Sequence, residues 1–290
     1  MKHKLLFIIN PIAGTRRKNH VPALIDQYLD AEKFDYKISF TTYAGQAKAL
    51  AHAALEEGYD AVVAVGGDGT INEIGNALLH SQCKLGIIPF GSGNGLARHL
   101  GIPMDTKAAI QKLNHWEDIQ IDAGQANEHI FFCTAGLGFD AWIGKVFADM
   151  PHRGLSNYVK AVLKEYRSYQ PSTYQLKIAD QVYQENCLLM TFANTTQWGN
   201  NAHIAPQASV EDGMLDLCII RSFPLYKAPK LGLDLFGKKL KPSTIMEYKL
   251  FQSCELYELP MCWFHTDGEV HQVTDRLHIK CIEKALRVII

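Results

Sequence analysis

The sequence predicts two domains of different fold class, an N-terminal α/β domain with a mostly parallel sheet and a C-terminal β-sandwich. In residues 1–122, apolar runs alternate with segments that carry apolar residues at helical spacing, which is typical of βαβ units. In residues 123–290, short strand-like runs follow one another at regular intervals, which is typical of a sandwich. A chain of 290 residues is also long enough for about two domains.

Four pairs of strand and helix are expected in the N-terminal domain. Its strands are near-continuous apolar runs, and such runs indicate a parallel sheet that is covered on both faces. The expected strands are residues 4–10, 36–40, 60–65 and 84–90. The expected helices are residues 21–29, 47–55, 71–78 and 93–102.

The C-terminal domain is predicted from six strand-like runs and two helical patterns. The strand-like runs are residues 129–134, 173–178, 181–192, 214–220, 247–252 and 276–281. The helical patterns lie around residues 157–169 and 226–239. The last residues, ALRVII, fit a strand of either domain, so the final strand is open to a return to the first domain.

Composition and charge exclude several classes of protein. A net charge of -1 and a pI near 6.9 provide no strong field for nucleic acid, so no nucleic-acid partner is expected. Apolar runs such as Leu5–Ile9 are far shorter than the roughly 20 residues of a membrane-spanning helix. The seven cysteines are odd in number and lack a Cys-x-x-Cys motif, which indicates free thiols in a reducing cytoplasm. Cys262 and His265 have ligand-like spacing without a second pair, so a zinc site is not favoured.

Three glycine-bearing loops follow the first, third and fourth expected strands. They are NPIAGTRRK at residues 10–18, GGDGT at residues 66–70 and PFGSGNG at residues 89–95. Ligands of open parallel sheets bind beyond the carboxyl ends of the strands, where glycines let backbone N–H groups approach phosphate oxygens near helix N-termini. One such loop alone is more often a tight turn, but three at one sheet edge favour a phosphate-binding site.

Asp68 lies between glycines in the second loop. A carboxylate beside phosphates is unfavourable unless a cation lies between them, so Asp68 is predicted to join a Mg²⁺ network, with helix capping as the alternative. Arg16, Arg17 and Lys18 fit neutralisation of a triphosphate, or a solvated basic turn. The chain lacks G-x-x-x-x-G-K-[ST] and fits G-x-G-x-x-G poorly, so neither a P-loop nor a Rossmann site is expected.

An ordered set of motifs covers nearly the whole chain. NPIAG, GGDGTINE and GSGNGLAR, followed by IDAG, FFCTAGLGFDA, VEDGMLDL and HTDGE, resemble the diacylglycerol kinase catalytic domain family, specifically its bacterial lipid kinases. These are related to diacylglycerol, sphingosine and ceramide kinases. The resemblance implies an α/β nucleotide-binding domain, a β-sandwich, and ATP-dependent phosphorylation of a lipid hydroxyl with Mg²⁺.

The resemblance also implies roles for individual residues. Asp267 matches the general base, Asp68 and Glu269 match the active-site metal network, and Asp122 matches an acid thought to join it. Glu73 matches an acid that supports the second loop. The implied nucleotide-binding residues are Asn10, Gly67, Thr70, Ser92 and Asn94, with Arg16 expected at the phosphates.

A second, structural Mg²⁺ is implied at Asp212, with the carbonyl groups of Ser209 and Met214 as further ligands. The residues alone leave a turn open at two of these places. Asp212-Gly213 also fits a hairpin turn, and Asp267-Gly268 is also a common turn pair.

Gly95 departs from the family pattern, because many members carry an aspartate there. Its absence removes one candidate metal contact. The lipid substrate, the effect of Gly95 and the oligomeric state, a homodimer included, are left open by the sequence.

Two other functions compete with the lipid kinase. NAD kinases share a Gly-Asp-Gly loop, and a nucleotide or lipid sensor without catalysis is the second alternative. The NPIAG and GSGNGLAR motifs argue against the first, and intact Asp68, Asp267 and Glu269 argue against the second.

Residues 224–241 mix leucines and Phe236 with five lysines. This pattern fits a peripheral helix on anionic lipid headgroups, and equally an amphipathic helix packed on its own core. The expected partner is therefore a lipid substrate at a membrane surface, with the protein in the cytoplasm or peripheral at the inner membrane face.

Overall fold

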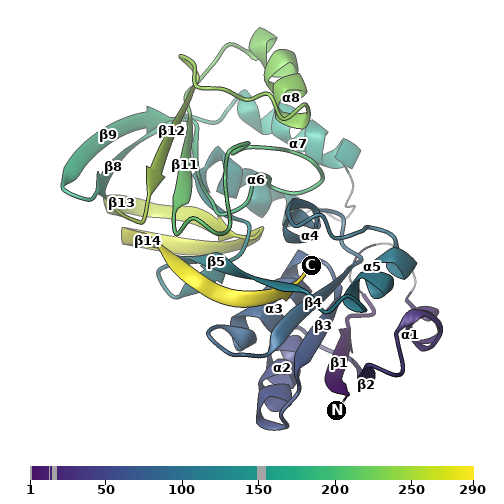
Figure 1. Cartoon of the computed structure of the whole chain (residues 1–290). Coiled ribbons are helices and arrows are strands. Elements are labelled where there is room, and N and C mark those ends of the chain that lie inside the picture. The colour runs from purple at the N-terminus through teal and green to yellow at the C-terminus, as the bar shows by residue number, and fades with distance from the viewer. Residues whose placement is uncertain (1, 13, 15–17, 149–154) are drawn as a thin grey trace. The chain divides into compact units, whose positions relative to one another are not determined.

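Two compact units make up the chain. The structure is a computed structural model that describes residues 2–12, 14, 18–148 and 155–290 (Figure 1). Unit 1 comprises Met1–Ala123, Gly199–Asn201 and Glu283–Ile290, and unit 2 comprises Gly124–Trp198 and Ala202–Ile282. The chain therefore crosses between the units four times.

Unit 1 is built on a parallel sheet. Its strands are β1 (His3–Ile9), β2 (Phe34–Phe40), β3 (Ala61–Gly66) and β4 (Lys84–Pro89), in the spatial order β4-β3-β1-β2. The end of β14 (Glu269–Ile289) adds a further parallel strand beside β4, where Val288 pairs with Leu85. The helices are α1 (Val21–Tyr28), α2 (Gln46–Glu56), α3 (Asp68–Leu78), α4 (Gly95–His99) and α5 (Thr106–Leu113).

Apolar side chains on both faces of this sheet explain why helices cover each of the two faces. Every residue of β3 is buried. On one face, Leu5, Phe7 and Ile9 share a core with apolar residues of α1 and α5. The other two long helices, α2 and α3, pack against each other. Near-continuous apolar strands thus give the doubly covered parallel sheet that the sequence predicts.

Unit 2 is an antiparallel sandwich, and its described residues include three α-helices. Its main sheet has the order β12-β11-β10-β7-β13-β14, and β8 pairs with both β13 and β9. The strands are β5 (Asp118–Ala126, shared with unit 1), β6 (His129–Phe131), β7 (Thr134–Gly138), β8 (Ser172–Ile178), β9 (Gln181–Cys187), β10 (Leu189–Ala193), β11 (Leu215–Ile220), β12 (Met246–Phe251) and β13 (Ser253–Thr266). The helices are α6 (Phe139–Ala148), α7 (Leu155–Tyr166) and α8 (Ala228–Phe236), preceded by the 3-10 turn η1 (Leu225–Lys227).

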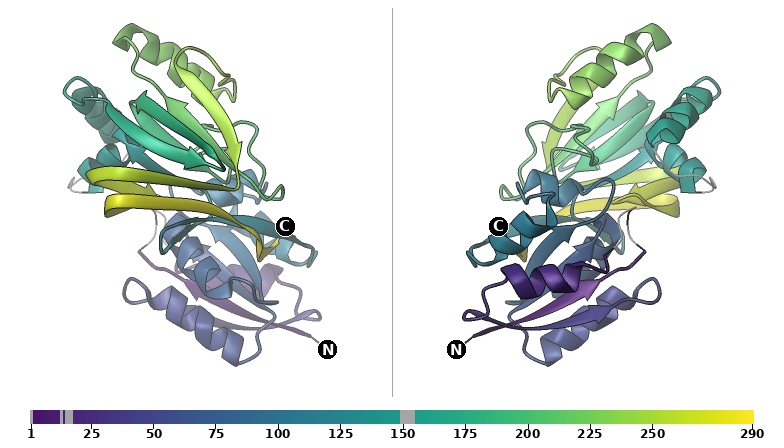
Figure 2. Two further views of the ribbon diagram at one scale, coloured as in Figure 1. Left: turned by 90° about the vertical axis from the view of Figure 1, so that its left-hand side faces the viewer. Right: turned by 90° about the vertical axis from the view of Figure 1, so that its right-hand side faces the viewer.

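The sandwich forms because β13 serves two sheets. Its first half pairs with β8 and its second half with β7, and register shifts around Leu259 separate the halves. Such irregularities bend a strand and change its twist. The inner core lies between the sheets, whereas α6, α7 and α8 contribute side chains to a second core on the outer face of β10 and β11. Figure 2 shows the ribbons of these strands and helices from two further sides.

The predicted fold class is confirmed, with differences in single elements. The run 181–192 is two strands, because Cys187 pairs with Ser172 of β8 whereas Leu189 pairs with Gly138 of β7. The expected helix at 226–239 is shorter and begins as a 3-10 turn. Helices α5 and α6 and strands β5, β7 and β13 were not predicted.

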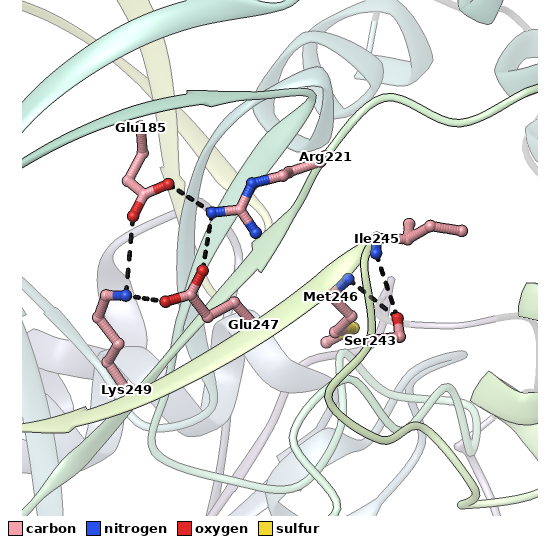
Figure 3. A network of polar contacts seen from close by, with 7 residues as sticks. All are labelled: Glu185, Arg221, Ser243, Ile245, Met246, Glu247 and Lys249. Atoms are coloured by element: carbon pink, nitrogen blue, oxygen red, sulfur yellow. Dashed lines mark hydrogen bonds and ion pairs between the residues drawn. The ribbon is translucent and has the colours of Figure 1, made fainter.

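A four-residue ionic network joins the two outermost strands of unit 2 (Figure 3). Arg221, which follows β11, lies 2.7 Å from Glu185 on β9 and 2.7 Å from Glu247 on β12. Lys249 of β12 lies 3.7 Å from Glu185 and also contacts Glu247. Charged side chains on end strands disfavour pairing with a strand of another chain. This network therefore disfavours such pairing at β9 and β12, and it also links the two strands.

Candidate active site

The three glycine-bearing loops of unit 1 approach one another backbone to backbone. A Cβ atom at Gly91 would lie 2.7 Å from the Cα of Gly67, and one at Gly14 would lie 1.8 Å from the carbonyl oxygen of Phe90. Neither distance leaves room for a side chain. The loops after β1, β3 and β4 therefore meet at the carboxyl end of the sheet, where open α/β sheets bind ligands.

Asn10 connects the first loop to the start of α3. Its Nδ2 donates a hydrogen bond to Oγ1 of the buried Thr70 at 3.1 Å, and its Oδ1 accepts from the Ile12 N–H. Thr70 in turn fills the space above Gly66, where a Cβ would lie 2.5 Å from the Thr70 hydroxyl. The two residues thus fix the backbone of two loops relative to each other.

Asp68 fixes the third loop. Its two carboxylate oxygens accept hydrogen bonds from the backbone N–H groups of Asn94 and Gly95, both at 2.8 Å. Asp68 is in the first turn of α3, and its two donors start α4, so one carboxylate interacts with the positive ends of two helices. The expected alternative, a side-chain cap on α3, is not observed, because the cap position is Gly67 and Asp68 bonds to the third loop instead.

Asn94 and Ser92 have different environments in the third loop. Asn94 is buried and left-handed at φ 50°, and its amide both accepts from and donates to the backbone of Gly91 at 2.8 Å. Ser92 is exposed. Asn94 therefore shapes the loop from within, whereas the Ser92 hydroxyl is accessible to a ligand.

Glu73 supports a different part of unit 1 from the one expected. Its carboxylate oxygens accept from the backbone N–H groups of Gly45 at 3.0 Å and Ala47 at 3.1 Å, at the N-terminus of α2. The residue accordingly stabilises α2 through the first-turn donors of that helix.

The basic residues of the first loop are only partly described. Arg16 and Arg17 lie outside the described residues. Lys18 is 2% exposed and its ammonium lies 5.2 Å from the centre of the Phe90 ring. Burial lowers the pKa of Lys18 from its ordinary value.

Asp122 holds the C-terminal segment of the chain. It is 1% exposed, and its Oδ1 accepts from the backbone N–H of Lys284 at 2.7 Å, where the backbone is left-handed at φ 49°. Both residues belong to unit 1. The hydrogen bond thus contributes to fixing β14 in that unit.

In unit 2, the Asp267 carboxylate is held by three backbone donors. Its Oδ2 accepts from the N–H of Phe132 at 2.8 Å, and its Oδ1 accepts from Cys133 at 2.8 Å and Thr134 at 3.1 Å. Three hydrogen bonds to two oxygens restrict the rotation of the side chain. The geometry therefore fixes the orientation of the Asp267 carboxylate.

Asp267 is also a turn residue. Asp267 and Gly268 have φ angles of 47° and 86° and connect β13 to β14 between the paired Thr266 and Glu269. Two positive φ angles in a two-residue hairpin are typical of a type I′ turn. Both interpretations of Asp267 are thus compatible, because the turn sets the backbone while residues 132–134 hold the side chain. Glu269 is exposed at the start of β14.

Asn194, which was not identified from the sequence, supports the segment that holds Asp267. Its buried side-chain amide donates to the Phe132 carbonyl oxygen at 2.8 Å. His265, which was considered only as a zinc ligand, is also buried, with Nε2 3.0 Å from the Asp140 carboxylate, which accepts from Thr191. Asn194 lies far from Asp267 in the chain and outside any motif, whereas His265 and Asp140 lie within HTDGE and FFCTAGLGFDA without an assigned role.

The His265–Asp140 ion pair raises the pKa of the His265 imidazole. Burial lowers the pKa of His265, but the Asp140 carboxylate and the nearby Asp267 raise it, and the net pKa is above its ordinary value of 6.5. Gly136 is required beside the pair, because a Cβ there would lie 2.4 Å from Asp140 and 2.7 Å from His265. The glycine in the TAGLG strand thus makes room for a buried charge.

The expected structural metal site lies in the bend before β11. Asp212 Oδ1 accepts from the Met214 N–H at 3.0 Å, and Ser209 Oγ accepts from the Glu211 N–H at 3.3 Å. The segment is a series of bends that leads into β11, so the hairpin-turn alternative is not observed. Burial, with a smaller contribution from Asp212, raises the pKa of Asp216 to about 6, although Gln207 opposes this.

These oxygen atoms are compatible with Mg²⁺. In the part of the chain that the structure describes, no group of three or more His, Cys, Asp or Glu side chains has the proximity of a metal-ligand set. Mg²⁺ in proteins is commonly held by one or two carboxylates and retains several waters. The Asp212 carboxylate in the bend is a ligand of this chemical type, as is the oriented carboxylate of Asp68.

Fold and site define a class of two-unit proteins. A parallel α/β unit with three glycine-bearing loops at one sheet edge is combined with an antiparallel sandwich. Residues 4–126 match the model of the diacylglycerol kinase catalytic domain, and residues 133–290 match the YegS C-terminal NAD kinase beta sandwich-like domain. The chain belongs to the diacylglycerol kinase family of lipid kinases, as the motifs in its sequence predict.

Curated relatives agree with this assignment, and a solved structure shares the fold. The diacylglycerol kinase of Bacillus subtilis is 32% identical over 254 residues, which cover 83% of this chain and 82% of the relative. The diacylglycerol kinase of Staphylococcus aureus strain bovine RF122 / ET3-1 is 28% identical over 285 residues, with 93% and 87% covered. A crystal structure of a diacylglycerol kinase from Bacillus anthracis superposes with a TM-score of 0.77 at 22% identity, covering 99% of this chain and 96% of that one.

An NAD kinase has a related fold. The structure of the Archaeoglobus fulgidus enzyme in complex with ATP superposes with a TM-score of 0.55 at 14% identity, covering 99% of this chain and 93% of that one. This similarity concerns the fold alone.

Proposed function

We propose that this protein transfers the γ-phosphoryl group of ATP to the hydroxyl of a lipid such as diacylglycerol. The observation that carries the proposal is the backbone-to-backbone meeting of three glycine-bearing loops at the carboxyl end of a parallel sheet, fixed by Asp68. Such an edge offers backbone N–H groups and helix N-termini to phosphate oxygens. Membership in the lipid kinase family supports the same reaction.

The nucleotide is assigned to unit 1. Asn10, Gly67 and Thr70 line the first two loops, while the exposed Ser92 hydroxyl and the shape imposed by Asn94 serve the third. In this proposal, Arg16 and Arg17 donate charge-assisted hydrogen bonds to the triphosphate and neutralise its charge. Lys18 is too buried to move freely and stabilises the loop against Phe90.

Mg²⁺ is assigned to two places. Asp68 and Glu269 would hold the ion of the reaction, with Asp122 as a further acid of that network, and Asp212 with the Ser209 and Met214 carbonyl groups would hold a structural one. A bound ion supplies charge neutralisation for the ATP phosphates. Gly95 contributes a backbone N–H to Asp68 instead of the carboxylate that many relatives carry, so Asp68 retains the orienting contact without a second acid beside it.

Asp267 is proposed as the general base. The lipid hydroxyl oxygen forms a bond to the γ-phosphorus while the bond from that phosphorus to the ADP oxygen breaks, and the hydroxyl proton passes to Asp267. ADP leaves as the second product. The three backbone donors of residues 132–134 hold the carboxylate in one orientation. Proton transfer is efficient when the base is held in such a fixed orientation.

The proposed partner is a lipid at a membrane surface, and the proposed location is the cytoplasm, where ATP is available. All seven cysteines are free, as a reducing compartment favours. Among the described residues, no helix has the length and hydrophobicity of a membrane span. Whether the protein is a homodimer is to be measured by sedimentation velocity.

The test is ATP turnover with Mg²⁺ against hydroxyl lipids in mixed micelles, with NAD as a soluble acceptor. Phosphorylation of a lipid is expected. Phosphorylated NAD would instead assign the NAD kinase reaction, and tight ATP binding without any product would assign a nucleotide or lipid sensor.

A pair of glycine variants tests the nucleotide site separately. Gly91→Ala places a methyl group against the Gly67 backbone, so ATP affinity should fall at least tenfold as the loops separate. Gly232→Ala on α8 is the control, because its Cβ meets no atom within 4 Å and the residue lies outside the three loops. Equal ATP affinity of the two variants would refute the assignment of nucleotide to this loop edge.

A further inference from the structure

The segment Leu225–Lys241, here called the α8 segment, exposes several large apolar side chains. Tyr226 is 77% exposed, Leu233 is 76% exposed and Phe236 is 53% exposed. No residue of η1 or α8 is buried. Figures 1 and 2 show α8 at the margin of unit 2.

Packing on the protein's own core explains only one side of this helix. Leu231 and Leu235 pack against the outer core of unit 2, one helical turn apart. Leu233 lies two residues from each of them, and two residues rotate a helix by about 200°, so its side chain points to the opposite side. Phe236 follows Leu233 by three residues and extends the same outward face.

The α8 segment is also strongly cationic. Lys227, Lys230, Lys238, Lys239 and Lys241 stand against a single acid, Asp234, in a chain with a net charge of -1. Exposed apolar side chains among lysines are typical of helices that rest at the boundary of headgroups and acyl chains. Two copies of this segment facing each other would repel, which disfavours a second copy of the chain as the occupant.

We propose that the α8 segment is a docking surface for an anionic phospholipid bilayer. Leu233, Phe236 and Tyr226 enter the boundary of the bilayer, and the lysines contact lipid phosphates. This inference rests on the proposed lipid-kinase function. It adds the surface through which unit 2 contacts the bilayer that holds the lipid substrate.

Vesicle sedimentation of the full chain tests the surface directly. Vesicles of phosphatidylcholine alone are compared with vesicles of equal parts phosphatidylcholine and phosphatidylglycerol. The double variant Leu233→Ser/Phe236→Ser should lower the partition coefficient at least tenfold on the mixed vesicles. Val182→Ser is the matched control, since Val182 is 62% exposed on β9 of the same unit, and it should bind as the wild type does.

The lysines provide a second, independent arm. Each lysine near an anionic surface contributes about a fivefold change in partitioning, so Lys238→Gln/Lys239→Gln should lose about 25-fold on mixed vesicles. On phosphatidylcholine alone the same variant should bind as the wild type does. Because all four side chains in the two double variants are exposed, melting temperatures should be unchanged.

Three results would overturn the docking surface. They are equal wild-type binding to both vesicle types, equal binding of Leu233→Ser/Phe236→Ser and Val182→Ser, and dissociation of a dimer by the apolar double variant without loss of vesicle binding. The last result would assign the face to a second copy of the chain.

Activity assays separate this inference from the kinase itself. The apolar double variant should phosphorylate a short-chain, water-soluble diacylglycerol at the wild-type rate and a vesicle-embedded diacylglycerol at least tenfold more slowly. Vesicle binding that depends on Leu233 and Phe236, without phosphorylation of any lipid, would support the surface and overturn the kinase. Lipid phosphorylation with unchanged vesicle binding of the variant would do the reverse.

Discussion

Replacement of Asp267 by asparagine should affect both catalysis and the stability of unit 2. Asparagine keeps one oxygen that can accept from the N–H groups of Cys133 and Thr134, but its NH₂ group faces the N–H of Phe132, which is also a donor. The variant thus replaces two charge-assisted hydrogen bonds by neutral ones and leaves one backbone donor unsatisfied.

The magnitude follows from these three contacts. Hydrogen bonds to charged groups contribute about 1.5–3 kcal/mol and neutral ones about 1 kcal/mol, and an unsatisfied buried donor costs about 1–3 kcal/mol. Because Asp267 is only half-buried, solvent compensates part of this, and a net loss of about 2–4 kcal/mol is expected. For a unit of this size, that loss lowers Tm by roughly 4–16 °C.

The assay combines thermal unfolding with lipid phosphorylation at a temperature where the variant is folded. Loss of a general base is expected to reduce kcat by about 10²–10⁴-fold. A Tm equal to that of the wild type would refute the hydrogen-bond reasoning. A folded variant with wild-type kcat would refute the role as base.

A stability control separates these two effects. Arg221→Met breaks the ionic network of β9 and β12 and should lower the stability of unit 2 by about 1–2 kcal/mol. It should leave kcat unchanged below its Tm, since Arg221 lies outside the proposed site. A matching loss of kcat would mean that destabilisation alone explains the effect of Asp267→Asn.

Three further predictions concern other carboxylates. Asp68→Asn should reduce kcat/KM for ATP by at least 10²-fold, because its NH₂ group would face one of the two backbone donors of the third loop. Glu73→Gln likewise replaces one of two acceptor oxygens, but at α2, so it should change Tm and not kcat/KM. Asp140→Asn should lower the free energy of unfolding by about 3 kcal/mol at about pH 6 and by less at about pH 9. The pKa of His265 is raised in the folded state, so the stability from its ion pair is complete below the unfolded pKa and is lost as pH rises through the folded pKa. Urea unfolding at both pH values measures this difference. Removal of Mg²⁺ with a chelator should lower the wild-type Tm by a few degrees but not that of Asp212→Asn, and equal shifts would contradict the structural metal site.

The fold class was predictable because its signals are local. Near-continuous apolar runs separated by helical patterns identify a covered parallel sheet, and regular short strands identify a sandwich. Strand ends are less local, since the break between β9 and β10 at Leu188 exists because the two segments pair with different partners. No periodicity in the sequence records which partner a strand finds.

Helix α6 shows a second limit of sequence reasoning. Its residues, FDAWIGKVFA, are mostly apolar and lack the polar face by which an amphipathic helix is recognised. Packing against the outer core around β10 and β11 accounts for this composition. Such a segment is identified as a helix only when its surroundings are known.

For the candidate site, the sequence by itself determined the three glycine-bearing loops, the carboxylates and the family to which their order belongs, and it predicted phosphate, metal and proton-transfer roles for them. The tertiary structure alone decided what holds those groups. Asp267 accepts from Phe132, which is 135 residues away in the chain, and Asp68 accepts from a loop 26 residues away. A motif specifies the side chain that the chemistry needs, but hydrogen-bond partners are set by which backbone segments the fold brings together, and that information is distributed over the whole core.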